Sequence, residues 1–220
     1  MTRIIDRTLA CIEVYEPGEK ILRQLAALLF SSGADFLEVS APEYESLGGA
    51  APNAQYILRI KELQDAEKYA SCKDIKRFVC ANKSDMGHRV YAEIRINDMR
   101  DFFTIVHYKD SSRVRVCGLA DAILQPVDTL LNNLRSTFSG TIELSPENDC
   151  HSATSIAVEW ALIGGSNVVT SFFGMDNMAA FEDVTRALNF LKGRKAKFGL
   201  EALDRLDGLL RELLMGCECP

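Results

Sequence analysis

Hydrophobic and polar positions along the chain follow two patterns that alternate from one end to the other. Short apolar runs that end in polar or glycine-rich corners are typical of buried strands, and apolar residues at i, i+3 and i+4 are typical of amphipathic helices. The strands predicted in this way are 4–14, 35–40, 56–60, 77–81, 89–96, 113–119, 141–144 and 167–173. The predicted helices are 19–32, 63–71, 98–108, 122–137, 153–161, 179–191 and 200–215, and the stretch 43–53 is predicted to be a loop.

Eight strands in alternation with helices predict an α/β fold, a closed (β/α)8 barrel of the TIM type. Parallel neighbours normally need a crossover of about ten residues or more. Between the predicted fourth and fifth strands, the polar stretch 82–85 is followed only by Met86, Gly87 and His88. We therefore expect the barrel to be trimmed near its fourth helix. The length of 220 residues favours one domain, 1–220.

The composition favours a globular protein and argues against some kinds of partner. Apolar residues make up 47% of the chain and charged residues 25%, as in ordinary soluble globular proteins. The net charge of −6 argues against a nucleic-acid or anionic-membrane partner. No apolar run approaches the roughly 20 residues that span a bilayer, and the start of the chain has no signal-peptide pattern. Seven scattered cysteines, an odd number, favour reduced thiols, so we expect a cytoplasmic location.

The stretch 141–184 concentrates the polar residues that carry candidate chemistry. Its strand 141–144 ends in the polar corner 145–149, and a helix follows that ends at Gly164 and Gly165. The next strand ends in a second polar corner, 174–177. This βαβ unit places its polar residues at the carboxyl ends of strands, where α/β folds build their sites.

This stretch also carries a family resemblance. Its part PENDCHSATSIAVEWALIGGSNVVTSFFGMDNMAAFEDV resembles the H-x-H-N-D-x-G-x-A and G-x-G-E-R-x-G-N-A segments of the DRE-TIM metallolyases. That superfamily includes homocitrate synthase, isopropylmalate synthase, citramalate synthase and hydroxymethylglutaryl-CoA lyase. Residues 5–9 (IDRTL) resemble its D-x-T-L motif and 35–39 (DFLEV) its D-x-I-E-V motif, so the resemblance covers most of the chain in the right order. It implies a TIM barrel, here without the C-terminal lid region into which the family's synthases continue.

The resemblance implies a metal site whose ligands are largely replaced in this sequence. In the family, one divalent metal is held by an Asp after strand one, by the two His of H-x-H and often by an Asn after strand eight, while an Arg stabilises the enolate charge. The Arg and Asp positions hold Ala10 and Cys11, and the two His positions hold Ser145 and Glu147. Oxygen donors suit Mg²⁺ or Mn²⁺, and the candidate ligands of a rebuilt site are Glu147, Asp176 and Asn177. With no Arg at the family's position, loss of the metal is the favoured reading.

Five further residues are candidates for catalysis. Glu13 and Glu38 are predicted near strand ends, either as a carboxylate pair with one raised pKa or as ordinary rim residues. Asp149 is a candidate catalytic group or a brace of its loop, and His151 a general acid–base or a polar residue at a helix start. Cys11 is either a thiol nucleophile or a small packed thiol.

Candidate substrate contacts complete the predicted site. Arg59 and Lys83 are expected to face the barrel mouth and to bind a carboxylate-bearing ligand. Asp121 matches the family's A-D-T-V-G motif, and Ser145 stands at the first His position.

Two functions follow from these observations. The first is a diverged carbon–carbon bond-forming or bond-cleaving enzyme that acts on a 2-oxo acid, with an acyl-CoA as co-substrate and a rebuilt site. The second is a non-catalytic barrel, a pseudoenzyme that senses a small carboxylic acid or accompanies a true synthase. The expected partners are a small carboxylic or oxo acid and either a second copy of the chain or a synthase chain that supplies the missing lid.

Overall fold

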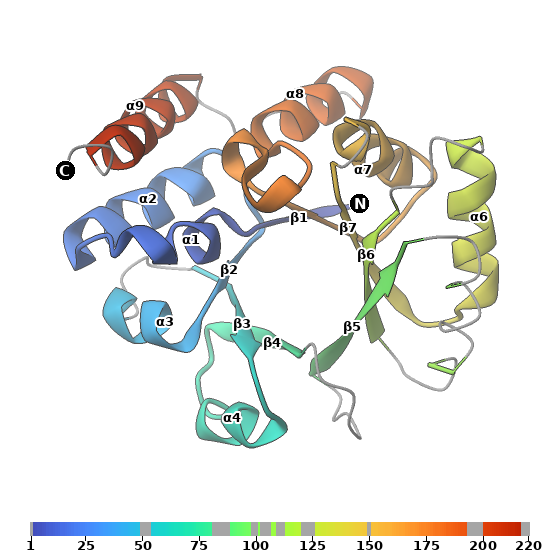
Figure 1. Ribbon diagram of the computed structural model, residues 1–220, viewed down its shortest axis with the longest axis horizontal. Coiled ribbons are helices and arrows are strands. Elements are labelled where there is room, and N and C mark those ends of the chain that lie inside the picture. Colours follow the sequence, from blue (N-terminus) through green and yellow to red (C-terminus); the bar gives the residue numbers. More distant parts are fainter. Residues whose placement is uncertain are drawn as a thin grey trace.

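The computed structural model describes residues 2–48, 54–80, 89–97, 101, 107–108, 113–119, 126–148, 151–192 and 200–216. Eight parallel strands close into a barrel in sequence order, and helices surround it (Figure 1). The strands are β1 (Arg3–Asp6), β2 (Phe36–Val39), β3 (Tyr56–Ile60), β4 (Ile75–Cys80), β5 (Val90–Ile96), β6 (Arg113–Gly118), β7 (Thr141–Pro146) and β8 (Asn167–Thr170). The predicted (β/α)8 TIM-type fold is confirmed.

The helices lie outside the strands and cover them with apolar faces. They are α1 (Thr8–Cys11), α2 (Glu19–Ser31), α3 (Ala41–Leu47), α4 (Leu63–Lys68), α6 (Val127–Thr137), α7 (Ala153–Leu162), α8 (Phe181–Lys192) and α9 (Leu200–Gly216), with the 3₁₀ segments η1 (Glu13–Tyr15) and η4 (Phe172–Asn177). In Figure 1, α9 lies beside α2 on the outside of the barrel. None of the helices in these ranges is both long and apolar enough to cross a bilayer.

The predicted first strand was too long. The β1 strand ends at Asp6, whose Oδ1 accepts a hydrogen bond from the Thr8 backbone N–H at 2.9 Å. That turn starts α1, and η1 follows it, so the chain leaves the barrel wall eight residues earlier than the apolar pattern predicted. Glu13 therefore lies in η1 and not on a strand.

The predicted loop 43–53 was wrong in its first half, where α3 forms. Ser40 and Glu43 make a reciprocal capping box, in which each side chain accepts a hydrogen bond from the other residue's backbone N–H. Pro42 stands in the first turn, which tolerates its missing N–H, and Gly48 ends the helix at φ 56°.

Two of the predicted elements fall outside the described residues. The β4 and β5 strands pair in parallel, but residues 81–88 between them are outside the described part of the chain, so the trimmed fourth crossover stays a prediction. The same holds for most of the predicted helix 98–108. That 1–220 forms one domain also remains a proposal.

The inside of the barrel carries a buried network of charged side chains. TIM barrels usually fill this space with branched apolar residues, and here an apolar cluster that includes Ile5 and Phe36 occupies only part of it. Arg115 of β6 is 1% exposed and reaches across to the fully buried Glu38 of β2, while its NH2 lies 2.8 Å from Glu143 of β7. Each of these charges is paired, as burial in a low-dielectric interior requires.

Replacing Arg115 with Met is expected to lower the free energy of unfolding by about 3–5 kcal/mol, because Glu38 and Glu143 would stay buried with less compensating charge. Urea denaturation measures this change. The matched control is Arg186→Met, which removes an exposed pair with Asp183 at 3.7 Å and is expected to cost less than about 1 kcal/mol. Equal effects of the two substitutions would show that the lumen network contributes no more than a surface ion pair.

Asp6 makes the stability of the fold depend on pH. Burial raises the pKa of this carboxyl from 3.8 to about 7, against the opposing effect of its hydrogen bonds from Thr8. Its Oδ2 is buried and has no hydrogen-bond partner among the described residues. The folded protein therefore holds a proton that the unfolded chain releases, and this contribution is complete below pH 3.8 and is lost as the pH rises through about 7.

Replacing Asp6 with Asn is expected to remove this pH dependence while keeping an oxygen that accepts from Thr8. Between pH 5 and 7, the free energy of unfolding of the native protein should fall relative to that of the variant, by up to about 1.4 kcal/mol per pH unit. Urea denaturation at pH 5, 6, 7 and 8 measures the difference. Parallel pH profiles of the two proteins would contradict a protonated Asp6.

Candidate functional site

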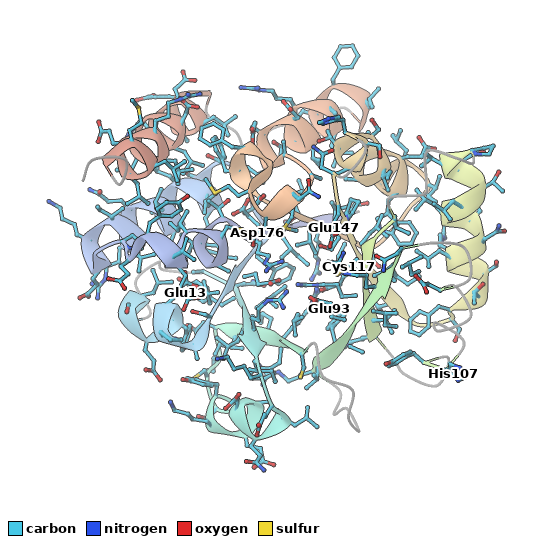
Figure 2. The ribbon with its side chains drawn as sticks, viewed as in Figure 1. Glu13, Glu93, His107, Cys117, Glu147 and Asp176 are labelled. Atoms are coloured by element: carbon cyan, nitrogen blue, oxygen red, sulfur yellow. The ribbon has the colours of Figure 1, made fainter. Side chains whose placement is uncertain are left out.

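The candidate site lies at the carboxyl ends of the strands, where the loops after β7 and β8 meet. Glu147 forms an isolated antiparallel bridge with Met178, and the Asn148 backbone N–H donates to the Asn177 carbonyl at 2.6 Å. Glu147 and Asp176, far apart in sequence, therefore lie on the same side of the mouth (Figure 2). The structure brings together the loops that carry all three predicted metal ligands.

Glu147 is held by an arginine that the sequence analysis did not identify. Both of its carboxylate oxygens accept hydrogen bonds from Arg95 of β5, with the NH1 donor 2.6 Å from Oε2. This two-point contact is the geometry in which arginine binds carboxylates most specifically. The hydrogen bond to Glu147 also raises the pKa of Arg95. Both oxygens of Glu147, one of the three expected metal ligands, are thus already engaged.

Arg7, directly after β1, is the most loosely held arginine of the mouth network. Its Nε lies 3.4 Å from Glu38 and its NH2 3.5 Å from Asp176, while NH1 lies 4.0 Å from the Met178 sulfur. The Nε makes no hydrogen bond with any described residue. The side chain is 25% exposed, although its Nε is buried. Shorter contacts of 3.0 and 2.8 Å hold Arg59.

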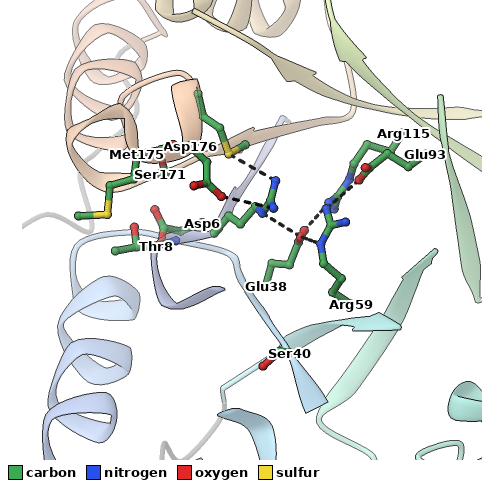
Figure 3. A network of polar contacts seen from close by, with 12 residues as sticks. Asp6, Thr8, Glu38, Ser40, Arg59, Glu93, Arg115, Ser171, Met175 and Asp176 are labelled. Carbon is green, nitrogen blue, oxygen red and sulfur yellow. Dashed lines mark hydrogen bonds and ion pairs between the residues drawn. The ribbon is translucent and has the colours of Figure 1, made fainter. Parts of the chain in front are cut away.

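Glu38 is the shared acceptor at the centre of this arrangement (Figure 3). Burial alone would raise its pKa, but the guanidinium groups of Arg115, Arg59 and Arg7 outweigh burial and hold the pKa at about 2. Glu38 is therefore a permanent anion, and the raised pKa considered for it is wrong.

Nor does Glu38 share its partners with Glu13. The exposed Glu13 carboxylate in η1 accepts a hydrogen bond from the Ser40 hydroxyl at 3.2 Å. The expected carboxylate pair is replaced by two separate groups, because β1 ends before the chain reaches Glu13.

Strained backbone conformations gather in the loops of the mouth. Non-glycine residues adopt positive φ angles of 66° after β6, 56° after β7, and 57°, 52° and 59° after β8; they are Leu119, His151, Phe173, Asp176 and Asn177. Such angles are uncommon for L-residues and concentrate at functional sites. This clustering favours a functional role for this end of the barrel over a purely structural one.

The other predicted residues are spread between the lumen, the loops and the surface. Arg59 is on β3 and faces the mouth as predicted, bound between Glu38 and Glu93. Ser145 is buried near the end of β7, in register with Cys117 of β6. His151 is exposed in the turn before α7. The predicted Lys83, Asp121 and Asp149 lie outside the described residues.

The residues at the family's metal positions do not fit a divalent cation. Cys11 is a buried, soft thiol in place of a carboxylate, and burial and then the nearby Asp176 carboxylate raise the pKa of this thiol. Ser145 is neutral, and Glu147 is bound by Arg95. In the part of the chain that the structure describes, no three His, Cys, Asp or Glu side chains form a group able to hold a metal.

Sequence reasoning missed most of the charged network. The arginines and carboxylates that it overlooked are Arg7, Arg77, Arg95, Arg115, Glu93 and Glu143. A signal was present, because β5 and β6 place charged residues at every second position (YAEIRI and RVRVC), and alternate positions of a barrel strand face inward.

Comparisons with known proteins agree with the barrel and with the motifs. No family model matches the chain. The omega subunit of homocitrate synthase from Clostridium pasteurianum is 23% identical over 96% of this chain, which spans 65% of that subunit's length. An HMG-CoA lyase from Acinetobacter baumannii, solved with coenzyme A and 3-methylmalate, shares the fold at a TM-score of 0.73 and 14% identity, over 97% of this chain and 91% of the lyase.

The carboxyl transferase domain of Rhizobium etli pyruvate carboxylase, solved with pyruvate, shares the fold at a TM-score of 0.72 and 10% identity, over 97% of this chain and 47% of that one. Fold likeness at such identities establishes the barrel alone. The motifs at 5–9, 35–39 and 146–184 occur in the family's order, and the similarity to the synthase subunit runs through nearly the whole chain. In its motifs and in its curated relative, the chain is similar to the DRE-TIM metallolyase superfamily, whose barrel fold it shares.

Proposed function

We propose that the mouth of this barrel binds the carboxylate of a 2-oxo acid and that the protein takes part in carbon–carbon bond chemistry of the homocitrate synthase type. The observation that carries this proposal is Arg7, a partly exposed guanidinium whose contacts to Glu38 and Asp176, at 3.4 and 3.5 Å, are looser than those of Arg59. A ligand carboxylate offers Arg7 the short two-point contact that it lacks in the free protein.

Arg7 also supports the chemistry that the family performs. Forming a carbon–carbon bond next to a 2-oxo group develops negative charge on oxygen, and a guanidinium beside that oxygen stabilises such charge. The family's arginine position holds Ala10, but Arg7 comes from the same turn after β1 and reaches the mouth. His151 and Asp149 remain the proposed proton-transfer groups, with an acyl-CoA as the proposed co-substrate.

A second function is supported by the curated relative, which is one subunit of a synthase. The Clostridium pasteurianum protein is named as a subunit, and the metal positions here lack a matching donor set. A non-catalytic barrel that binds the acid and accompanies a synthase chain, or a second copy of itself, is consistent with both observations. For either function we propose a cytoplasmic location.

Carboxylate binding is tested by isothermal titration calorimetry with pyruvate and with 2-oxoglutarate as probes. Replacing Arg7 with Ala is expected to weaken the binding of whichever probe binds by about 10- to 100-fold, because a hydrogen bond to a charged group contributes about 1.5–3 kcal/mol. The control Arg186→Ala, on the exposed face of α8, should bind like the native protein. An unchanged dissociation constant in the Arg7 variant would remove the observation on which the proposal rests.

The enzyme and the non-catalytic subunit differ in turnover. Purified protein incubated with pyruvate or 2-oxoglutarate and acetyl-CoA should release free coenzyme A if it is an acyltransferase, and Arg7→Ala should lower that rate. Release of coenzyme A only after a synthase chain is added would favour the accompanying subunit. Binding of an oxo acid without turnover in either mixture would favour a sensor.

A further inference from the structure

The geometry points to the guanidinium groups of Arg7 and Arg95 as the cationic centre of the mouth, standing in place of the divalent cation that the family's barrels hold. This inference deepens the proposed function and rests on it for the identity of the ligand. It states that binding of the acid needs no metal, and that Arg95 keeps the cation position closed.

The two guanidinium groups lie at candidate metal-ligand positions. Glu147 occupies the second His position of the family, and Asp176 lies near the position of the fourth ligand. In this structure each of those carboxylates meets a guanidinium: Arg95 donates to both oxygens of Glu147, and NH2 of Arg7 lies 3.5 Å from Asp176. Positive charge is thus delivered to the two candidate metal-ligand positions that hold an acidic residue in this chain.

The fold brings the two arginines to the same side of the mouth. They come from distant parts of the chain, because Arg7 directly follows β1 and Arg95 lies on β5. The loops that carry their partners are joined by the Glu147–Met178 bridge, and Arg7 also lies 4.0 Å from the Met178 sulfur. The two pairs therefore belong to one site.

The ion pairs described in the lumen and mouth are balanced in charge. The described ion pairs of the lumen and mouth join five arginines to five carboxylates, namely Arg7, Arg59, Arg77, Arg95 and Arg115 with Glu38, Glu93, Glu143, Glu147 and Asp176. A divalent cation placed among them would add two positive charges beside two guanidinium groups. It would also have to displace Arg95 from a two-point contact, and both effects oppose its binding.

An anionic ligand, unlike a cation, can bind without leaving a buried charge unpaired. The Asp176 side chain is 49% exposed, so its carboxylate can turn to solvent when a ligand carboxylate takes over Arg7. Glu38 keeps Arg59 and Arg115 when Arg7 is engaged. The two arginines consequently have different tasks: Arg7 contacts the ligand, and Arg95 is a positioning residue that holds Glu147.

The test is binding of Mn²⁺ and of pyruvate by the native protein and by an Arg95→Ala variant, each first treated with EDTA. Free Mn²⁺ is followed by electron paramagnetic resonance, and pyruvate binding by calorimetry with and without about 1 mM added Mn²⁺. The native protein is expected to leave Mn²⁺ free and to bind pyruvate with the same dissociation constant in both buffers. Arg95→Ala, which frees Glu147, is expected to raise Mn²⁺ affinity at least ten-fold, and Glu147→Gln in the same background should reverse the gain.

Stoichiometric Mn²⁺ binding by the native protein, or pyruvate binding that requires Mn²⁺, would overturn the inference while leaving the proposed function standing. An Arg95→Ala variant that stays folded by circular dichroism and gains no Mn²⁺ affinity would also overturn it. Absence of pyruvate and 2-oxoglutarate binding in every buffer would instead refute the proposed function, and the Mn²⁺ measurements would still decide whether Arg95 closes the cation position. Arg186→Ala serves as the surface control throughout.

Discussion

The desolvation of charge inside the barrel is the constraint on which the rest of this structure depends. Glu38, Glu143 and Arg115 are removed from water almost completely, and such charges are tolerated only when each has a partner of opposite sign. The strands must therefore keep one register, because a shift by one residue would turn the network out of the lumen. The strand register that closes the barrel is therefore also the one that pairs the buried charges.

The same constraint shapes the mouth. The buried Arg115 makes short hydrogen bonds, whereas the partly exposed Arg7 approaches its partners only to 3.4 and 3.5 Å. The still more exposed Arg95 is held tightly by Glu147, so Arg7 is the loosely held charge of the mouth. A charge held loosely at the edge of a paired network can exchange its partner at small cost, whereas the buried charges cannot. The strained loops after β7 and β8 place Glu147 and Asp176 at this edge. The proposed recognition of a carboxylate by Arg7 rests on this loose contact.

The barrel was predictable from sequence because the period of its apolar positions changes wherever a strand gives way to a helix. Two of the errors in the element boundaries arose from local polar contacts that such periods do not report, while the strand predicted as 167–173 ends at Thr170 where η4 follows. Asp6 ends β1 by accepting from Thr8, and Ser40 with Glu43 starts α3. The spacing of Ser40 and Glu43 is a capping-box pattern, so this helix was readable, whereas the early end of β1 was not.

The site was less predictable than the fold. Family motifs located the loops of the mouth, but they drew attention to the positions of lost ligands and away from the residues that replace them. Arg7 lies only three residues before the family's arginine position, yet its direction depends on how the chain turns after β1. Arg95 meets Glu147 only once the barrel closes, and 52 residues separate the two in sequence. Contacts of this kind depend on register and shape, which a single sequence does not specify.

The most direct test of this account is a crystal structure of the protein with pyruvate bound, grown in the presence of MnCl₂. The account predicts a carboxylate within about 3 Å of the Arg7 guanidinium, the normal distance of a charged hydrogen bond. It also predicts that Arg95 remains on Glu147 and that no metal lies between them. A manganese ion coordinated by Glu147 and Asp176, with Arg95 displaced, would contradict it.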